Sequence, residues 1–311
     1  MLSLLSDLLW SKILITVLIG LGLWFTLASR FIQFRYFGKM FSILTANHHE
    51  SDGHLSSFQA LILSVAGRVG GGNIAGVAVA ITLGGPGAIF WMWVVGLMGM
   101  TTSFVECTLA QVYKTAEVDG TYRGGPAYYI AKGLGAKWQW LAVIYSILLL
   151  VTFGVAFVTL QSYAVANSLK DAFNIPLSYS GIGLAIIVGM IIFGGVKRIA
   201  KVTEILVPVM AGGYLLIALV ILAMNINEIP DTLMMIVNSA FGLGPAVGGG
   251  VGAAILMGVK RGLFSNEAGL GSAPNVAAVA YVPHPANQGV VQAFSVFIDT
   301  ILLCTCTALI I

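Results

Sequence analysis

Charged residues are scarce in this chain. Aspartate, glutamate, lysine and arginine together make up 9% of the 311 residues, whereas hydrophobic residues make up 58%. A water-soluble domain of this length needs more polar surface than such a composition supplies. The sequence therefore excludes a soluble globular protein. It predicts an all-α polytopic membrane protein, because helices satisfy their own backbone hydrogen bonds in lipid.

Cysteine and histidine are also rare, which excludes several kinds of chemistry. The three cysteines fall in apolar segments, and the four histidines fall in polar loops (Cys107, Cys304, Cys306; His48, His49, His54, His284). An intramembrane serine protease would lack its base, and no H-E-x-x-H motif supports a zinc enzyme. The net charge of +3 comes without a basic run, so we expect no nucleic-acid partner. We expect no enzymatic activity and no cofactor.

Long apolar segments recur along the chain. A helix of about 20 apolar residues crosses the ~30 Å hydrocarbon core of a bilayer. The predicted membrane spans are 10–29, 57–83, 88–113, 138–168, 178–195, 200–224, 231–262 and 289–311.

The basic residues predict how these spans are oriented, because cytoplasmic loops are enriched in lysine and arginine. The loops after the first, third, fifth and seventh spans hold 12 of the 15 basic residues (Arg30, Arg35, Lys39, Lys114, Arg123, Lys132, Lys137, Lys197, Arg198, Lys201, Lys260, Arg261). We therefore expect these loops in the cytoplasm and the N-terminus outside.

Residues 66–73, Ala-Gly-Arg-Val-Gly-Gly-Gly-Asn, interrupt the second apolar segment. Each glycine costs about 1 kcal/mol relative to alanine inside a helix, so this stretch favours unwound backbone. Unwound backbone survives at membrane depth only where it is buried in protein or lines a cavity. The sequence predicts a broken helix whose free amides and carbonyls bind a solute and an ion; a kinked helix packed closely on a neighbour is the alternative.

A second break is predicted within 231–262, either at 242–245 or at 248–250, and Pro245 favours the first position. The two broken spans are five spans apart and run in opposite directions. Such a pair indicates an inverted repeat, as in secondary transporters. We divide the chain into an added N-terminal helix (1–29), a cytoplasmic loop (30–56), a first five-helix repeat (57–224) and the start of a second repeat (231–311).

Four sequence segments also resemble a known family. The runs GRVGGGNIAGVAVAITLGGPGAIFWMW (67–93) and GVKRGLFSNEAGLGSAPNVAA (258–278) are similar to the two hallmark segments of the sodium:alanine (amino acid:cation) symporters. The resemblance continues through SFVECTLAQVYK (103–114) and YRGGPAYYI (122–130). It implies a leucine-transporter-like fold, sodium as the coupling ion, and alanine or glycine as the transported amino acid. It also implies a multi-pass protein of a plasma membrane of the bacterial inner-membrane type.

Members of this family are longer and have a complete second repeat. The resemblance therefore implies that this chain is truncated at its C-terminal end and that its second repeat is incomplete.

The predicted substrate site lies at the two breaks. The N-terminus of the helix after the first break has free N–H groups, from Gly71, Gly72 and Asn73, that suit an amino acid carboxylate. Phe241 and Gly242 at the second break are candidates for the roof and wall of the pocket, although Phe241 serves equally well as ordinary packing.

Sodium prefers oxygen ligands, which the first break offers as free carbonyls. The candidate ligands are Ala66, Arg68, Val69, Asn73 and Asn238, where Asn238 is alternatively an interhelical hydrogen bonder. Asp299 is in the middle of the last span and by depth could reach the ion site; otherwise it is a helix-packing residue.

Arg68 is a charge inside a span and should have a partner. We expect an ion pair with Glu106 or Glu267 that helps to close an inner gate; a purely structural ion pair is the alternative.

The leading hypothesis is a secondary active transporter that couples sodium to a small neutral amino acid by alternating access. The alternatives are a proton-coupled amino acid transporter, for which Asp299 is the candidate carboxylate, and a non-transporting fragment of such a symporter. A channel is disfavoured, because two opposed helix breaks in one chain do not form a ring around a pore.

Overall fold

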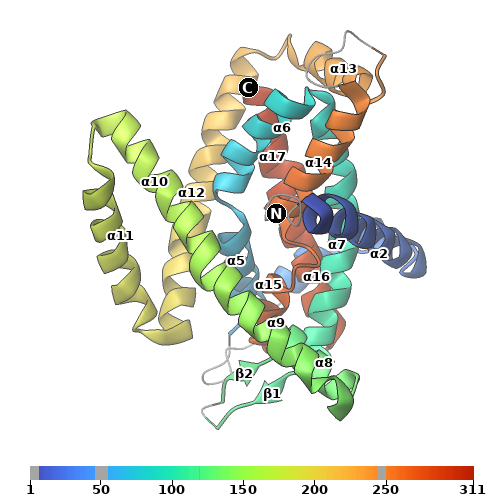
Figure 1. The fold of residues 1–311 in the computed structure, drawn as a ribbon, viewed down its shortest axis with the longest axis vertical. Helices are drawn as coiled ribbons and strands as arrows, with labels where there is room; N and C mark the ends of the chain where they lie inside the picture. Colours follow the sequence, from blue (N-terminus) through green and yellow to red (C-terminus); the bar gives the residue numbers. More distant parts are fainter. Residues whose placement is uncertain (1–6, 46–54, 119, 244–249) are drawn as a thin grey trace.

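A computed structural model describes residues 7–45, 55–118, 120–243 and 250–311. The described part is a bundle of helices with one short hairpin (Figure 1). The helical elements are η1 (Asp7–Leu14), α2 (Ile15–Ala28), α3 (Ile32–Arg35), α4 (Phe37–Thr45), α5 (Ser57–Arg68), η2 (Gly72–Gly76), α6 (Val77–Gly84), α7 (Gly87–Val112), α8 (Pro126–Gly133), η3 (Ala136–Trp138), α9 (Gln139–Val151), η4 (Thr152–Phe157), α10 (Val158–Phe173), α11 (Leu177–Ile192), α12 (Gly195–Met224), α13 (Ile229–Ala240), α14 (Gly250–Asn266), α15 (Ser272–Ala278), α16 (Pro285–Val296), η5 (Phe297–Leu303) and α17 (Cys304–Ile310).

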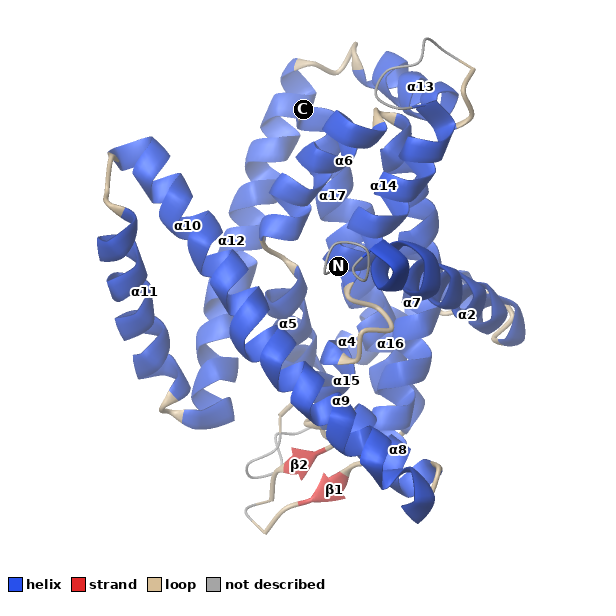
Figure 2. Cartoon of the chain, in the orientation of Figure 1, coloured by secondary structure: helices blue, strands red, loops and turns tan. Residues whose placement is uncertain are grey.

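Strands β1 (Thr115–Ala116) and β2 (Tyr122–Arg123) pair antiparallel in the connection between α7 and α8. Figure 2 shows them together at one end of the molecule, while the rest of the described chain consists of helices and the loops that join them. This hairpin marks the end of the bundle that also carries the end of α7 and the start of α8.

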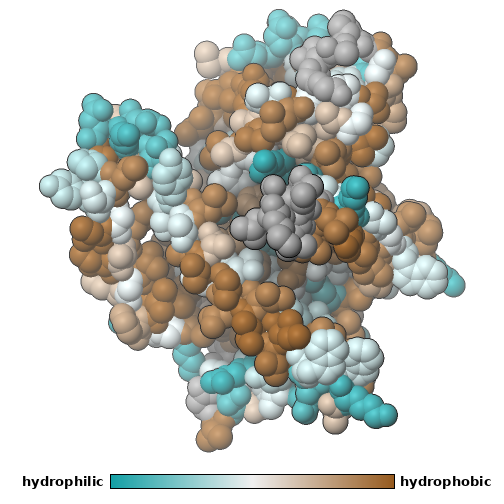
Figure 3. All heavy atoms as spheres, in the orientation of Figure 1, coloured by the Kyte–Doolittle hydropathy of each residue, from teal (hydrophilic) through white to brown (hydrophobic). Residues whose placement is uncertain are grey.

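Five described helices are long and apolar enough to cross a membrane, and a bent pair is a sixth candidate. The five are Leu8–Ala28, Gly87–Val112, Ala136–Phe173, Gly195–Met224 and Pro285–Ile310; the pair joins Ser57–Arg68 to Gly72–Gly84 at an angle of 55°. The expected polytopic helical architecture and the break in the second span are confirmed. On the face drawn in Figure 3, apolar atoms cover the middle of the molecule and hydrophilic atoms gather toward its ends.

Helix α7 and the continuous rod α16–η5–α17 form the centre of the bundle. More than half of each is buried, in contrast to the largely exposed α9–α10 and α12. A core cluster that includes Val77, Ile89 and Met92 packs α6 and α7 together with α17. A glycine also lets α7 approach α13 closely, because a Cβ on Gly87 would lie 2.5 Å from the backbone nitrogen of Ala240.

The predicted span 231–262 is not one broken span. Helix α13 ends at Ala240 and α14 begins at Gly250, and the two are joined by a connection of which residues 244–249 lie outside the described residues. Helix α13 is only 12 residues long and packs across α7 and α14 at one end of the bundle (Figure 1), so it does not form one half of a membrane span with α14. Of the glycines at the predicted break positions, Gly242 lies at the end of α13 and Gly250 at the start of α14, and the others lie outside the described residues.

Lys260 and Arg261 lie inside α14 and not in a loop, which corrects their predicted position. The charge asymmetry then rests on the ten other basic residues. The orientation with the N-terminus outside stays a prediction.

Candidate functional site

The first break separates α5 from η2 at residues 69–71. Asn73 closes it locally, since its Oδ1 accepts the N–H of Gly70 at 2.9 Å and its own N–H donates to the Gly70 carbonyl at 3.1 Å. The N–H of Gly71 donates to Oε1 of Gln161 on α10, at 3.1 Å. Side-chain oxygens therefore accept two backbone N–H groups that in a regular helix would bond to backbone carbonyls one turn earlier.

A second break lies between α14 and α15, at residues 267–271. Glu267, Gly269 and Gly271 all have left-handed backbone conformations, with φ of 52°, 84° and 86°. Glu106 on α7 accepts the N–H of Gly269 at 3.2 Å, and the hydroxyl of Tyr145 on α9 donates to the Gly271 carbonyl at 2.9 Å.

The interruption that adjoins the first break is this one and not the predicted stretch at 242–250. The sequence does contain a signal for this break, because the polar residues Asn266 and Glu267 are followed by two glycines, Gly269 and Gly271, which disfavour a continuous helix. A span that ends at 262 places this segment in the following cytoplasmic loop, whereas α14 continues to Asn266.

Four polar side chains meet where the two breaks adjoin the last rod. The amide nitrogen of Asn73 donates to Oδ1 of Asp299 at 2.6 Å and lies 3.3 Å from Oγ of Ser265. The hydroxyls of Ser265 and Thr300 donate to Oδ2 of Asp299, at 2.9 and 2.8 Å. Asp299 is fully buried. One carboxylate thus joins the first break, the end of α14 and η5.

Arg68 is buried beside this cluster, but it does not form the predicted ion pair. Its guanidinium donates to the hydroxyls of Ser295 and Ser103, and it lies 3.5 Å from the Gln292 carbonyl. Among the described residues, no carboxylate oxygen lies within 4 Å of its nitrogens. The hydroxyls and carbonyl of α7 and α16 take the place of a carboxylate.

The interior near the breaks holds more acidic than basic groups. Glu106, Glu267 and Asp299 are buried there, and among the described residues Arg68 is the one buried basic side chain. An isolated charge in a low-dielectric interior is costly, so an acidic excess needs protons or a bound cation. The single positive charge of Arg68 does not balance the three buried carboxyl groups.

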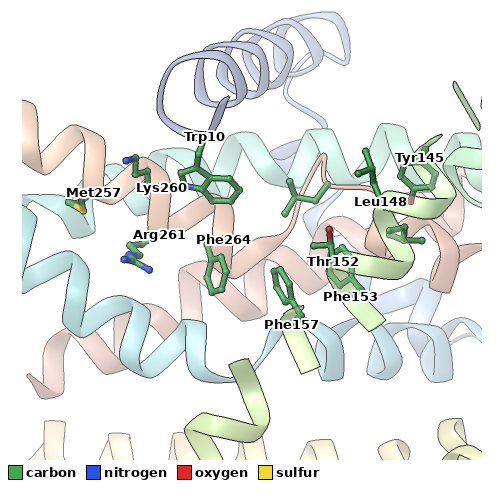
Figure 4. A pocket seen from close by; sticks show the side chains of 12 residues that line it. Trp10, Tyr145, Leu148, Thr152, Phe153, Phe157, Met257, Lys260, Arg261 and Phe264 are labelled. Atoms are coloured by element: carbon green, nitrogen blue, oxygen red, sulfur yellow. The ribbon is translucent and has the colours of Figure 1, made fainter. Parts of the chain in front are cut away.

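A cavity of about 580 Å³ reaches the breaks from between α5, α9–α11 and α15; we call it the central cavity. Its lining includes Arg68, Gln161, Glu267 and Ser272. A second pocket, of about 620 Å³, lies between η1, α9–η4 and α14, and includes Lys260 and Arg261 (Figure 4).

An aromatic pair stands at the first break. The rings of Phe157 and Phe264 stack with centroids 5.3 Å apart and an angle of 25° between their planes. Both rings line the pocket of Figure 4, Phe157 also lines the central cavity, and Phe264 lies against Gly72. Phe157 thus borders both cavities, and Phe264 joins it to the first break.

The structure divides the predicted site residues into two groups. Ala66, Arg68, Val69, Gly71, Gly72 and Asn73 lie at the first break, where Asn73 also meets Asp299. Asn238, Phe241 and Gly242 lie at the end of α13. Phe241 is half exposed and packs against Phe90 and Trp91, with centroids 5.0 and 6.1 Å away. The ring that lies next to Gly72 at the first break is that of Phe264.

These observations describe a helical membrane protein with two interrupted helices whose polar groups meet in its interior. Comparisons with known proteins agree with that class. The model of the sodium:alanine symporter family matches residues 1–311, so the chain belongs to this family.

Curated relatives align along nearly all of the chain. The amino-acid carrier protein AlsT of Bacillus subtilis (strain 168) is 52% identical over 306 residues, which are 98% of this chain and 65% of AlsT. The probable sodium/glutamine symporter GlnT of the same strain is 48% identical over 98% of this chain and 64% of GlnT. The sodium/alanine symporter AgcS of Methanococcus maripaludis is 42% identical over 97% of this chain and 68% of AgcS.

The chain thus spans about two thirds of the length of these relatives. The names of the relatives describe carriers and symporters and not enzymes, in line with the prediction from the sequence.

Proposed function

We propose that this protein is a sodium-coupled symporter for a small neutral amino acid, alanine or glycine, in a plasma membrane. The observation that carries the proposal is the meeting of Asn73, Ser265 and Asp299 at the two breaks. Relatives named as a sodium/alanine symporter and as a probable sodium/glutamine symporter support an amino acid as the transported solute.

The sodium ion would bind at Asp299. A hard cation prefers carboxylate, hydroxyl and amide oxygens, and Asp299, Ser265, Thr300 and Asn73 offer all three kinds within one buried cluster. Asn73 would turn its amide so that oxygen and not nitrogen faces the ion. The free carbonyls of Ala66, Arg68 and Val69 remain candidate ligands, and the acidic excess favours a cation at this place.

The amino acid would bind at the first break with its carboxylate toward the amides of Gly71 and Gly72. Gln161 now accepts the Gly71 N–H, so a substrate carboxylate would replace a neutral acceptor with a charged one and strengthen the bond. The wall of Phe157 and Phe264 would cover a small side chain and exclude a large one. The half-helix dipole after Gly72 adds to the attraction.

Alternating access in a leucine-transporter-like inverted repeat is the motion that we propose for this site. The aromatic pair would block the route of the substrate to one side of the membrane, and the walls of the central cavity would block its route to the other side. The N-terminus would lie outside.

The test is equilibrium binding of radiolabelled alanine to the purified chain in NaCl and in KCl, each at pH 5.5 and pH 7.5. We expect saturable binding that requires sodium at both pH values. Binding in KCl that appears only at pH 5.5 would favour the proton-coupled alternative, for which Asp299 is the candidate proton acceptor. Saturable binding that is independent of both ions would reject ion coupling.

A further inference from the structure

Helix α15 follows the second break and is only seven residues long. A helix this short is unstable by itself in water, so its position depends on what it contacts. Ser272, Ala273, Asn275 and Val276 line the central cavity, whereas Ala277 and Ala278 are fully buried. Helix α15 therefore forms one wall of the cavity. The contacts that fix its C-terminal end should influence the width of the cavity.

Two side chains hold that far end, one from the last turn of α7 and one from just beyond it. The amide nitrogen of Gln111 donates to the carbonyls of Ala277 and Ala280, the latter at 3.0 Å. The ammonium of Lys114 donates to the Ala280 carbonyl at 2.7 Å. The last carbonyls of a helix have no partner within it, and a cation there also interacts favourably with the helix dipole.

The ammonium of Lys114 is itself held in place. It lies 3.9 Å from the centroid of the Tyr122 ring, on strand β2. Such a cation–π contact, together with the hydrogen bond, limits the positions that the flexible lysine can take. The hairpin also approaches α15 directly, because a Cβ on Gly124 would lie 2.6 Å from the Cβ of Ala278.

The same end of α15 is tied to the segment that enters α5. Leu55 and Ala280 form a parallel β-bridge, in which the N–H of Tyr281 donates to the Leu55 carbonyl at 2.9 Å. Helix α5 precedes the first break and α15 follows the second, and both helices line the central cavity. A displacement of the end of α15 would therefore pull on the start of α5.

We infer that Gln111 and Lys114 are positioning residues that clamp the end of α15 to α7 and so keep the central cavity narrow. We call these two side chains and the carbonyls of Ala277 and Ala280 the α15 clamp. Release of the clamp widens the cavity between α5, α10 and α15. The inference concerns the same cavity as the proposed function but does not depend on which solute or ion binds there.

The test measures access to Ser64, a buried residue whose hydroxyl has no hydrogen-bond partner and which lines the central cavity. A Ser64→Cys reporter is placed in the full chain after Cys107, Cys304 and Cys306 have been changed to alanine. Its rate of reaction with a polar maleimide is measured in detergent without sodium or amino acid. Loss of one charged hydrogen bond is expected to raise the labelling rate of the Lys114→Met variant about tenfold.

Two variants serve as matched controls. Lys114→Arg keeps a charged donor and should label at nearly the reporter's own rate. Lys132→Met removes a nearby lysine whose hydrogen bonds within the described chain go to the Tyr113 carbonyl and Thr115 and not to α15, and it should leave the rate unchanged. Equal labelling of Lys114→Met and the unmodified reporter would overturn the inference, and so would an equal increase in Lys132→Met.

Hydrogen exchange gives a second measurement that needs no cysteine. In Gln111→Leu, a milder change that keeps the ammonium of Lys114, the backbone amides of residues 275–281 should exchange several-fold faster than in the parent chain, while amides of α12 stay unchanged. Unaltered exchange at 275–281 would contradict the clamp. Because neither measurement involves transport, failure of sodium-dependent binding would leave these results interpretable.

Discussion

At the scale of single residues, the site depends on one buried carboxylate and the groups that surround it. Asp299 accepts hydrogen bonds from Asn73, Ser265 and Thr300, which come from three different helical segments. Its position in the middle of an apolar span was visible in the sequence, and its partners were not, because Ser265 and Thr300 look like ordinary helix-packing residues until the chain is folded.

Asp299→Asn tests the role of this carboxylate. The change keeps the size of the side chain and a hydrogen-bonding oxygen but removes the negative charge. We expect the sodium concentration that half-saturates alanine binding to rise on the order of tenfold to 100-fold, as expected for the loss of one charged ligand. Asp171→Asn, which changes an exposed aspartate that accepts from Asn167, should leave this concentration unchanged.

Lys114, just beyond the end of α7, should titrate far below an ordinary lysine. Burial lowers its pKa from the usual 10.5 to about 8, because the charged form loses water. Since the unfolded chain binds this proton more tightly, the group's contribution to the free energy of unfolding should rise between about pH 8 and pH 10.5. NMR of the 13C-methylated lysines should show one resonance with a midpoint near pH 8 that is missing in Lys114→Arg; a midpoint above 10 would contradict this.

At the scale of elements, the two breaks are stabilised in different ways. The first is closed by its own Asn73 and by Gln161, whereas the second is held by Glu106, Tyr145 and close packing. The long rod from Ala136 to Phe173 reaches both breaks, since it carries Tyr145 and Gln161. Figure 1 shows α9 and α10 crossing the bundle diagonally, which explains how one rod contacts both breaks.

Gly269→Ala should distort the second break. Gly269 has a φ of 84°, and an added Cβ would lie 2.6 Å from a methyl group of Leu18. The left-handed conformation alone costs an L-residue roughly 1–2 kcal/mol, and the contact adds to it. We expect a lower melting temperature and weaker alanine binding. Gly20→Ala, in α2 with open space around it, should leave alanine binding intact and raise the melting temperature slightly.

At the scale of the whole molecule, a bound cation would add a further link between parts of the bundle that are far apart in the sequence. Asp299 belongs to the central rod, Ser265 to α14 and Asn73 to the bent pair. Ion binding at their meeting point would therefore couple the first half of the chain to the second.

Sodium should stabilise the folded protein against heat more than potassium does. A ligand that binds only the folded state at 100 times its dissociation constant adds about 2.7 kcal/mol. We expect a sodium-specific rise in melting temperature at constant ionic strength, and its loss in Asp299→Asn. An equal rise in sodium and potassium would indicate a general salt effect and would contradict a selective site.

The sequence by itself determined the membrane class, the positions of most spans and the first break, because hydrophobic length and glycine content act locally. Only the tertiary structure decided that the second break is at 267–271, that Arg68 bonds hydroxyls and a carbonyl in place of a carboxylate, and that Phe264 and not Phe241 faces the first break. Those facts depend on which helices become neighbours. Glycine-rich turns and glycine-rich breaks look alike in a sequence, and contacts across the bundle are what distinguish them.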